Sequence, residues 1–393
     1  MENNKKINIV MFNMSLYNDW LNGVSNRNFH IMNTLLADER INKIIAIDYL
    51  PWTWKKVIKN YLFGYLRTTT NLIFQNLLTR ASQQSEKLIV VSSVASYFGK
   101  KIFFKDLAKI IKFCQIDQDF ICWSCNPLLT DYFDELPAKS YIFDAVDDWT
   151  LHPSYQTIKP LIEKNYQEII NRSDLIFTVA EELMTKFAEN AHVYWLPNAI
   201  DLNHYLQKAT LIDKEIGDIP HPIIGYIGIV LGRLDLDIIK YLALHNPQKS
   251  IVIAGAYKGR LFYWDRKLIK ELKKYPNIYL LGYISYQRSA MYIQQFDLGI
   301  IPHLPDSYVK ATNPMKMYEY LACGKPIVAS PAPGLEMFSE IKIAQTPEDF
   351  NQLVISELAE DNEQKQHARI ELVKEHTWQQ RIKQMLDLLY EQL

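Results

Sequence analysis

The amino-acid sequence predicts an α/β protein made of two doubly wound parallel sheets, one in each half of the chain. Strand-like apolar runs alternate with helical periods almost throughout, which is typical of parallel strands joined by crossover helices. The 393 residues are also too many for one hydrophobic core of usual size. We therefore expect an N-terminal domain over residues 1–200, a C-terminal domain over residues 201–376 and a last helix over residues 377–393.

The N-terminal half is predicted to open with a buried strand over residues 6–12. A loop over residues 17–28 and a helix over residues 28–37 follow it. Further strands are expected wherever a short run of apolar and β-branched residues recurs. These runs are 43–49, 88–92, 120–124, 140–143, 175–179 and 193–196.

The C-terminal half repeats this alternation after a linker around residues 198–220. Strands are expected at residues 223–228, 250–255, 278–281, 298–302 and 326–330, with helices between them. The tail has an apolar helical period made by Ile382, Met385, Leu386, Leu389 and Leu393. Each half therefore has the pattern of a complete doubly wound domain.

Composition and charge narrow the class of protein. Hydrophobic residues make up 48% of the chain and charged residues 22%, which is typical of a soluble globular protein. The net charge of −1 gives no reason to expect nucleic-acid binding. The first residues lack the apolar core of a secretion signal, and no uncharged apolar run reaches the roughly 18 residues of a membrane span. We therefore expect a cytoplasmic protein.

The four cysteines do not form the pattern of a disulfide framework. Cys122 and Cys125 have the spacing of a redox or zinc pair, but no second pair accompanies them. A buried strand edge explains these two residues better than a metal site.

The segment over residues 313–330 is predicted to be a helix followed by a buried strand. Pro314 suits a first helical turn, where its missing N–H would have had no partner, and Asn313 is a suitable cap. Gly324 supplies the left-handed residue that commonly ends a helix.

Lys316 and Glu319 are spaced i, i+3, so they lie on one face near the start of this helix. A helix N-terminus attracts anions through its free N–H groups and its dipole. A lysine for a phosphate and a carboxylate for a sugar hydroxyl would together suit a nucleotide-sugar. The alternative from spacing alone is an ordinary surface ion pair.

Three carboxylates stand at the end of a predicted buried strand, namely Asp144, Asp147 and Asp148. The carboxyl ends of strands face the ligand crevice in open α/β sheets. Crowded carboxylates repel one another, so one of them is a candidate general base. The alternative is an aspartate that caps the following helix.

Residues 51–80 contain five Lys and Arg residues, six interleaved aromatic residues and no acidic residue. A second basic amphipathic stretch covers residues 100–112. Bases beside interfacial aromatics suit an anionic membrane surface. The alternative is an ordinary pair of helices whose aromatic side chains enter the core.

The stretch PMKMYEYLACGKPIVAS, from Pro314 to Ser330, resembles the C-terminal signature of GT-B glycosyltransferases of family 4, the glycosyl transferases group 1, of the bacterial polysaccharide-biosynthesis type. The resemblance implies two Rossmann-like doubly wound domains that face each other across a cleft, and a last helix that crosses back to the N-terminal domain. Glu319 falls at the second carboxylate of the family's Glu-x7-Glu motif, which binds the nucleotide ribose. The first carboxylate would fall at Ala311, where this chain departs from the pattern, and Lys316 implies contact with donor phosphate or sugar.

Other segments match the family in order, from about Asp144 to Trp378. Pro197-Asn198-Ala199-Ile200-Asp201 resembles its crossing between domains, where a simple turn is the alternative. The glycine loop at Gly228 and the cation Arg233 are implied to contact the donor diphosphate. Gly282 and Tyr283 fall in the segment that faces the nucleotide base, and Asn313 adjoins the donor helix.

The resemblance also assigns residues that would act near the acceptor. Asp147 and Asp148 stand where the family often carries a His-Asp pair, so Asp147 is implied as the base and Asp148 as its support. Gly23 and Arg27 lie in a loop implied to face the acceptor or a phosphate. His303 and Lys310 precede the signature helix, and a solvent-facing histidine is the simpler expectation for His303.

We expect a hexosyltransferase that moves a sugar from a nucleotide diphosphate-sugar, with UDP favoured, to a polysaccharide or lipid-linked glycan acceptor. The resemblance implies no cofactor and no metal. Contact with the inner face of the cell membrane is expected through residues 51–80 and 100–112. Two alternatives stay open, a nucleotide-sugar epimerase of the same fold and a non-catalytic sugar-binding or scaffold protein. A nicotinamide-dependent oxidoreductase is disfavoured, because no G-x-G-x-x-G follows the first strand of either half.

Overall fold

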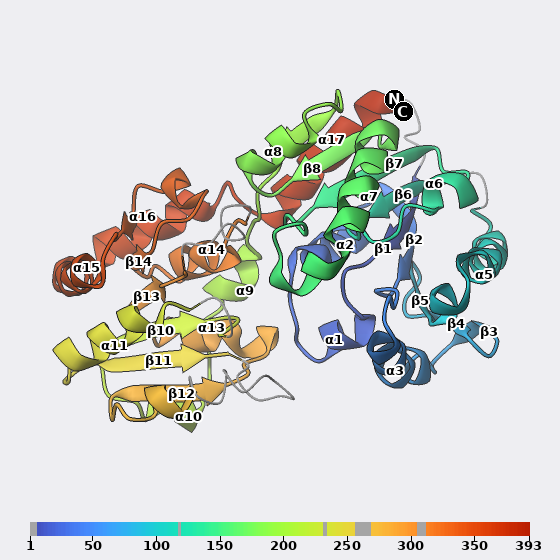
Figure 1. The fold of residues 1–393 in the computed structure, drawn as a ribbon. Coiled ribbons are helices and arrows are strands. Elements are labelled where there is room, and N and C mark those ends of the chain that lie inside the picture. Colours follow the sequence, from blue (N-terminus) through green and yellow to red (C-terminus); the bar gives the residue numbers. More distant parts are fainter. Residues whose placement is uncertain (1–5, 117–118, 231–233, 256–268, 305–311) are drawn as a thin grey trace. The chain divides into compact units, whose positions relative to one another are not determined.

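The computed structural model describes residues 6–116, 119–230, 234–255, 269–304 and 312–393 (Figure 1). The chain divides into two compact units. Unit 1 comprises residues 1–197 and 382–393, and unit 2 comprises residues 198–381. The boundaries expected from the sequence, at residues 200 and 376, lie a few residues from these divisions.

Unit 1 is built on a sheet whose described strands follow the order β3-β4-β5-β2-β1-β6-β7-β8-β9. The strands are β1 (Ile7–Phe12), β2 (Ile41–Ile47), β3 (Leu72–Gln75), β4 (Thr79–Gln83), β5 (Leu88–Ser93), β6 (Ile121–Ser124), β7 (Ser140–Ala145), β8 (Leu175–Thr178) and β9 (Val193–Trp195). All neighbours pair in parallel except β3 with β4 and β4 with β5. The strand order reverses at β1, so the ligand-binding edge is expected at the carboxyl ends of β1, β6 and β7.

The helices of unit 1 join these strands. They are α1 (Tyr17–Leu21), α2 (Arg27–Ala37), α3 (Trp54–Phe63), α4 (Ala95–Phe98), α5 (Lys100–Phe113), α6 (Tyr132–Glu135), α7 (Lys159–Arg172) and α8 (Glu181–Phe187), with 3₁₀ turns at Tyr65–Arg67 and Pro153–Ile158. The last helix, α17 (Trp378–Gln392), contributes its residues from 382 onward, where Asp387 pairs with Arg40 at 3.0 Å.

Unit 2 contains a parallel sheet whose described strands follow the order β12-β11-β10-β13-β14-β15. The strands are β10 (Ile223–Ile227), β11 (Ser250–Ala254), β12 (Ile278–Gly282), β13 (Leu298–Ile301), β14 (Ile327–Ala329) and β15 (Ile341–Ile343). Its described helices are α9 (Leu202–Leu206), α10 (Lys214–Gly217), α11 (Leu236–His245), α13 (Tyr286–Gln294), α14 (Met315–Ala322), α15 (Pro347–Glu360) and α16 (Glu363–Val373), with a 3₁₀ turn at Leu335–Met337. The order reverses between β10 and β13, which marks the crevice where open α/β sheets bind ligands.

The sheet of unit 2 is covered on both faces. Met317 and Leu321 of α14 join one core cluster together with α13, and Ile239 of α11 joins the other with Phe350 and Val354 of α15. Burial of these apolar faces is the main favourable term in folding. The two doubly wound α/β sheets predicted from the sequence are therefore confirmed.

Three local predictions differ from the structure. The segment expected as a loop over residues 17–28 contains the short helix α1, followed by a turn in which the N–H of Gly23 bonds the carbonyl of Trp20 at 2.9 Å. The antiparallel pair β3–β4 and the short strand β15 were not expected. They are short elements without a long apolar run, so periodicity carries little signal for them.

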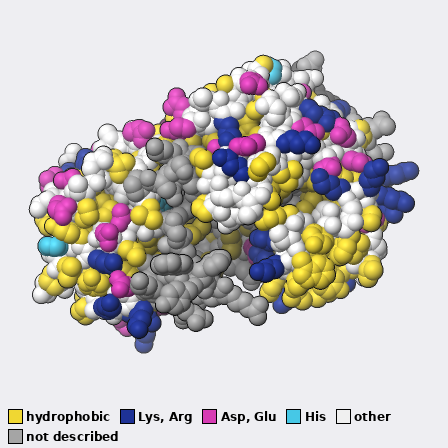
Figure 2. Space-filling view, viewed as in Figure 1, with side chains coloured by type: hydrophobic (Ala, Val, Ile, Leu, Met, Phe, Trp, Pro, Cys, Tyr) yellow, Lys and Arg dark blue, Asp and Glu magenta, His cyan; other side chains and the backbone are white. Residues whose placement is uncertain are grey.

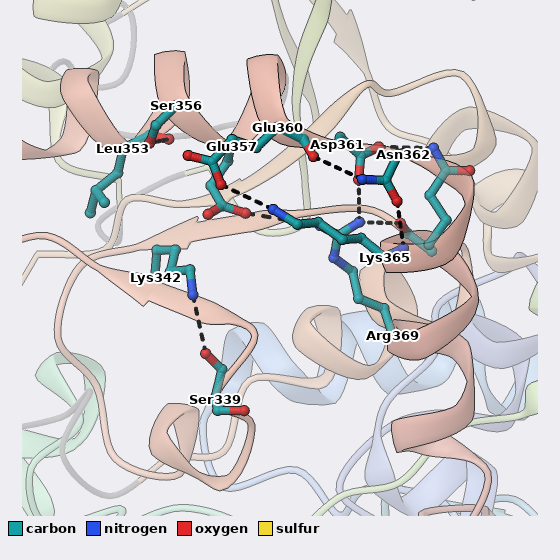
Figure 3. A network of polar contacts seen from close by, with 12 residues as sticks. Ser339, Lys342, Leu353, Ser356, Glu357, Glu360, Asp361, Asn362, Lys365 and Arg369 are labelled. Carbon is teal, nitrogen blue, oxygen red and sulfur yellow. Dashed lines mark hydrogen bonds and ion pairs between the residues drawn. The ribbon is translucent and has the colours of Figure 1, made fainter.

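Helix α14 is held at its end by a side chain of α16. Gly324 has φ +69°, the left-handed conformation expected of a residue that ends a helix. The Arg369 guanidinium donates to the Gly324 carbonyl at 3.0 Å and to Asp361 at 2.6 Å, and it lies 3.9 Å from Glu357 (Figure 3). Arg369 is buried, so this charge fixes α16 against the end of α14.

Replacing Arg369 by Met should destabilise the protein by about 3 kcal/mol or more, because buried Glu357 and partly buried Asp361 would lose their cation. Lys365→Met is the matched control on the same helix, since Lys365 pairs with Glu360 on the surface and its loss should cost under about 1 kcal/mol. Denaturant unfolding followed by circular dichroism measures both. Equal losses for the two variants would show that Arg369 does not anchor α14.

Candidate functional site

The carboxyl ends of β10 and β13 meet the first turn of α14 at the point where the strand order of unit 2 reverses. Gly228 directly follows β10 and has φ +143°, a conformation that favours glycine. A Cβ at this position would lie 3.1 Å from Cε of Lys316 and 3.3 Å from its Nζ. Glycine therefore lets the lysine lie directly against the backbone at this turn.

Lys316 extends from the first turn of α14 towards two side chains of the sheet. Its Nζ lies 3.5 Å from Nε2 of His303 and 5.2 Å from the ring centroid of Tyr226. The Tyr226 hydroxyl donates to the carbonyl of Ile229 at 2.6 Å and lies 3.4 Å from Nε2 of His303. An ammonium and the start of a helix thus converge beside an imidazole, and the ammonium and the helix start both favour an anion.

The expectation that His303 faces solvent is wrong, because its side chain is only 2% exposed. His303 follows β13 and forms an isolated bridge with Leu234, and its ring lies beside the Tyr226 hydroxyl. No local pattern predicts this burial, since pairing between residues so far apart depends on the tertiary fold.

Glu319 lies one turn after Lys316 on α14. Burial raises the pKa of this carboxyl group, while a hydrogen bond with Tyr205 and the charge of Lys316 lower it. The Tyr205 hydroxyl of α9 also lies 3.1 Å from the hydroxyl of Ser289. Both side chains are only partly exposed, and Glu319 also bonds Tyr205, so the pair has contacts beyond those of an ordinary surface ion pair.

Asn313 does not cap α14, contrary to the sequence prediction. The cap residue is Pro314, and no side chain accepts a hydrogen bond there. Instead Oδ1 of Asn313 accepts from the N–H of Asn198 at 3.0 Å and from the Tyr318 hydroxyl at 3.2 Å, and Nδ2 of Asn198 donates to the Asn313 carbonyl at 2.7 Å. These bonds tie the first residue of unit 2 to the start of the site helix.

The remaining candidates of unit 2 are more dispersed. Gly282 ends β12, and its carbonyl accepts from the N–H of Gly255 at 2.6 Å, beside the turn that carries Gly228. Tyr283 follows with 48% of its side chain exposed. Arg233, Lys310 and Ala311 lie outside the described residues.

In unit 1, Arg27 and Asp144 form a buried ion pair. Arg27 is the first residue of α2, and Asp144 lies near the end of β7. The Arg27 guanidinium contacts both carboxylate oxygens of Asp144, at 2.9 and 3.0 Å. Both side chains are almost fully buried. The charge of Arg27 is thus balanced by Asp144 at the edge of the sheet. Gly23 lies in the turn that precedes α2.

Asp148 is buried, and both of its carboxylate oxygens accept hydrogen bonds. One of its oxygens accepts from the backbone and hydroxyl of Thr150 at 2.9 and 2.6 Å, and the other accepts from Nζ of Lys186 at 2.8 Å. With Asp144 and Asp148 each paired to a cation, the expected crowding of three carboxylates is relieved. Asp147, at the bend between them, is half-buried.

Aromatic side chains that the sequence prediction missed lie beside Asp147. The rings of Trp149 and Tyr155 stack with centroids 4.8 Å apart and planes 4° apart, and Trp52 lies 5.8 Å from Tyr155. Burial raises the pKa of Tyr155, and the charge of Asp147 adds to the increase, so the two groups are near one another. Flat aromatic faces next to a carboxylate suit a sugar ring with its hydroxyl groups.

Comparison with known proteins identifies the fold. Sucrose-phosphate synthase from Thermosynechococcus elongatus has a TM-score of 0.68 at 13% identity, covering 98% of this chain and 99% of that chain. Anabaena Alr3699/HepE in complex with UDP and glucose has a TM-score of 0.61 at 12% identity, covering 98% of this chain and 99% of that chain. The chain has the GT-B fold.

Sequence matches confirm the resemblance of this GT-B chain to glycosyltransferases. Residues 237–387, which include Lys316 and Glu319, match the model of a family described as glycosyl transferase-like. The Bacillus subtilis protein named "Putative teichuronic acid biosynthesis glycosyltransferase TuaH" is 25% identical over 221 residues, which are 53% of this chain and 53% of that protein. The chain thus spans about half the length of the curated relative that it matches.

Across the described ranges, no three His, Cys, Asp or Glu side chains gather where they could hold a metal ion. Cys122 and Cys125 are buried free thiols at the end of β6, and burial raises the pKa of both. Among the described residues, no helix combines the length and apolar character that a membrane crossing requires.

The short helix α1 of this GT-B chain is held by a buried carboxyl group at the end of β2. Asp48 accepts a hydrogen bond from the N–H of Tyr17 at 2.6 Å and is almost completely buried. Burial raises the pKa of Asp48 from 3.8 to about 7, although bonds from Tyr17 and Ser92 oppose the increase. As pH rises from 3.8 to about 7, the unfolded chain releases this proton while the folded chain keeps it, so stability falls across that window.

The variant Asp48→Asn should therefore gain stability relative to the wild type by roughly 2 kcal/mol between about pH 5 and about pH 7.5. Denaturant unfolding at several pH values measures the difference. The matched control is Asp38→Asn, because Arg40 lowers the pKa of Asp38 and its contribution stays constant over this window. A difference between Asp48→Asn and wild type that does not change with pH would contradict the prediction.

Proposed function

We propose that the protein is a glycosyltransferase that moves a sugar from a nucleotide diphosphate-sugar, with UDP as the favoured nucleotide, to a polysaccharide or lipid-linked glycan. The observation that carries the proposal is the cluster of Lys316, His303 and Gly228 at the start of α14, with Glu319 one turn further along. The glycosyl transferase-like family match and the teichuronic acid relative support the transferase activity and a role in polysaccharide biosynthesis. The UDP complex of HepE supports the choice of nucleotide.

The donor is proposed to bind unit 2 through its diphosphate and ribose. The Lys316 ammonium and the dipole at the start of α14 would balance the phosphate charge beside the His303 imidazole, and Gly228 lets the phosphate approach the backbone. Glu319 would accept hydrogen bonds from the ribose hydroxyls, with Tyr205 orienting its carboxylate.

Three further donor contacts are proposed from the family resemblance. Arg233 is assigned to the diphosphate, Gly282 and Tyr283 to the nucleotide base, while Asn313 holds the start of α14 through Asn198. Fixed cations that stabilise charge growing on the leaving diphosphate perform the role that a metal ion has in other transferases. We therefore propose that the reaction requires no cofactor and no bound metal.

The acceptor is proposed to bind unit 1 on the aromatic faces of Tyr155 and Trp52, beside Asp147. The Asp147 carboxylate would take the proton of the acceptor hydroxyl. The acceptor oxygen would then bond to the anomeric carbon of the donor sugar as the bond between that carbon and the diphosphate breaks. Asp148, paired with Lys186, holds the bend that carries Asp147. Gly23 and Arg27 are proposed to shape the neighbouring acceptor loop, with Arg27 acting through Asp144.

The site of action is proposed to be the inner face of the cell membrane, with the protein bound peripherally. A lipid-linked acceptor lies at such a surface, and the basic aromatic segments 51–80 and 100–112 belong to unit 1, which is the unit proposed to bind the acceptor.

Calorimetric titration with UDP, GDP, ADP and NAD tests the donor site. UDP should bind, and Lys316→Met or Glu319→Ala should weaken its binding by about tenfold or more, because each removes a charged contact. Lys342→Met, a surface lysine near Ser339, should leave the affinity unchanged, and so should a chelator. Tight NAD binding without nucleoside diphosphate binding would overturn the proposal.

Replacing Asp147 by Asn should lower kcat by about 100-fold or more with little change in UDP affinity, because the general base is lost while the donor contacts stay intact. Transfer of labelled sugar from a UDP-sugar to membrane glycan extract measures the rate. The control is Asp218→Asn, an exposed carboxylate of unit 2. Isomerised donor formed without acceptor would instead indicate an epimerase, and full activity of Asp147→Asn would remove its role as base.

A further inference from the structure

Helix α3 of unit 1 carries an apolar stripe that faces away from the protein. Only Val57 and Asn60 of this helix are buried. Trp54, Ile58 and Leu62 are 57%, 47% and 46% exposed. They are spaced i, i+4 and i+8, so they lie along one face of the helix, and that face is distinct from the buried one.

This stripe continues into neighbouring elements. The ring centroid of Trp54 lies 6.1 Å from that of Tyr97, and Tyr97 lies 5.6 Å from Phe98 at the end of α4. Figure 2 shows hydrophobic side chains gathered over α3 and the adjoining hairpin of unit 1. The exposed apolar side chains of this region are Trp54, Ile58, Tyr61, Leu62, Phe63, Leu66, Leu72, Leu77, Tyr97, Phe98 and Ile102, which we call the α3 face.

Cations border the α3 face. Lys55 and Lys59 flank the apolar stripe on the same helix, and residues 51–80 contain no acidic residue, although Lys59 pairs with Asp19 at 3.1 Å. Helix α5 turns Lys101, Lys105, Lys109 and Lys112 outward, with exposed Phe113 beside them. Its one acidic residue, Asp106, is buried. Figure 2 shows Lys and Arg side chains over α5 next to the hydrophobic area over α3.

The exposure of the aromatic side chains distinguishes a membrane-facing surface from an ordinary pair of helices whose aromatic residues enter the core. Aromatic residues that entered the core would be buried, as Tyr65 is, whereas Trp54 and Tyr61 are exposed. Single exposed apolar residues need no explanation, but a contiguous group of them marks an interaction surface. A rim of lysines around tryptophan and aliphatic side chains complements acidic headgroups above an apolar layer.

We propose that the α3 face docks the protein on a membrane surface rich in anionic lipid, with Trp54, Ile58 and Leu62 entering the interface and the lysines of α3 and α5 contacting headgroups. This inference deepens the peripheral location given under the proposed function, and it concerns unit 1 alone. Donor binding is measured on unit 2. Failure of the membrane proposal would therefore leave the donor proposal testable, and the reverse is also true.

Sedimentation of the full chain with vesicles tests the inference. Vesicles of phosphatidylcholine with phosphatidylglycerol should bind the protein about tenfold more strongly than phosphatidylcholine alone, and added salt should weaken the binding. The triple variant Trp54→Ser, Ile58→Ser, Leu62→Ser should lose at least about tenfold in partitioning to the mixed vesicles. The matched control changes Leu211, Leu244 and Ile355 of unit 2, which are also exposed, to Ser and should bind as the wild type does.

A second variant guards against misfolding as the cause of lost binding. Lys101→Gln with Lys105→Gln changes only exposed side chains of α5, and it should reduce binding and flatten its salt dependence. UDP titration of each variant verifies that unit 2 is intact. Equal binding to both vesicle types, no vesicle binding, or a concentration-dependent dimer in light scattering that the triple variant abolishes would each overturn the proposal, the last by showing that a second copy covers the α3 face.

Discussion

Helix α14 is held at both ends by polar bonds to residues far away in the sequence, and the geometry of unit 2 depends on this. At its start Asn313 exchanges hydrogen bonds with Asn198, and at its end Arg369 donates to the Gly324 carbonyl. Because α14 is fixed at both ends, Lys316 in its first turn has a fixed position relative to the sheet. The closeness of Lys316 to Gly228 and His303 follows from that position.

Local spacing was sufficient to predict most of the elements but not the partners of their polar side chains. The alternation of strands and helices, the position of α14 and the left-handed Gly324 all follow from patterns a few residues long. Asn313 was expected to cap its own helix because that is the nearest use for its side chain. In the structure it bonds Asn198, 115 residues away, and no local rule anticipates such a choice.

The same limit applies to charges in unit 1. Three aspartates at one strand end suggested mutual repulsion, and the family resemblance implied that Arg27 faces the acceptor or a phosphate. Folding brings Arg27 to Asp144 and Lys186 to Asp148, because buried charges persist where they find a partner. Asp147 is distinguished from its neighbours by its place at the bend beside Tyr155, which only the tertiary structure shows.

The turn after β10 is crowded by the backbone as well as by Lys316. A Cβ at Gly255, directly after β11, would collide with the carbonyl oxygen of Gly228. A side chain at Gly255 would therefore displace the turn at Gly228, whereas one at Gly228 would meet Lys316 and would need a left-handed φ. An engineer who wishes to transplant this turn into another scaffold must move the ends of β10 and β11 as one piece, because single-residue exchanges at either glycine would deform the recipient.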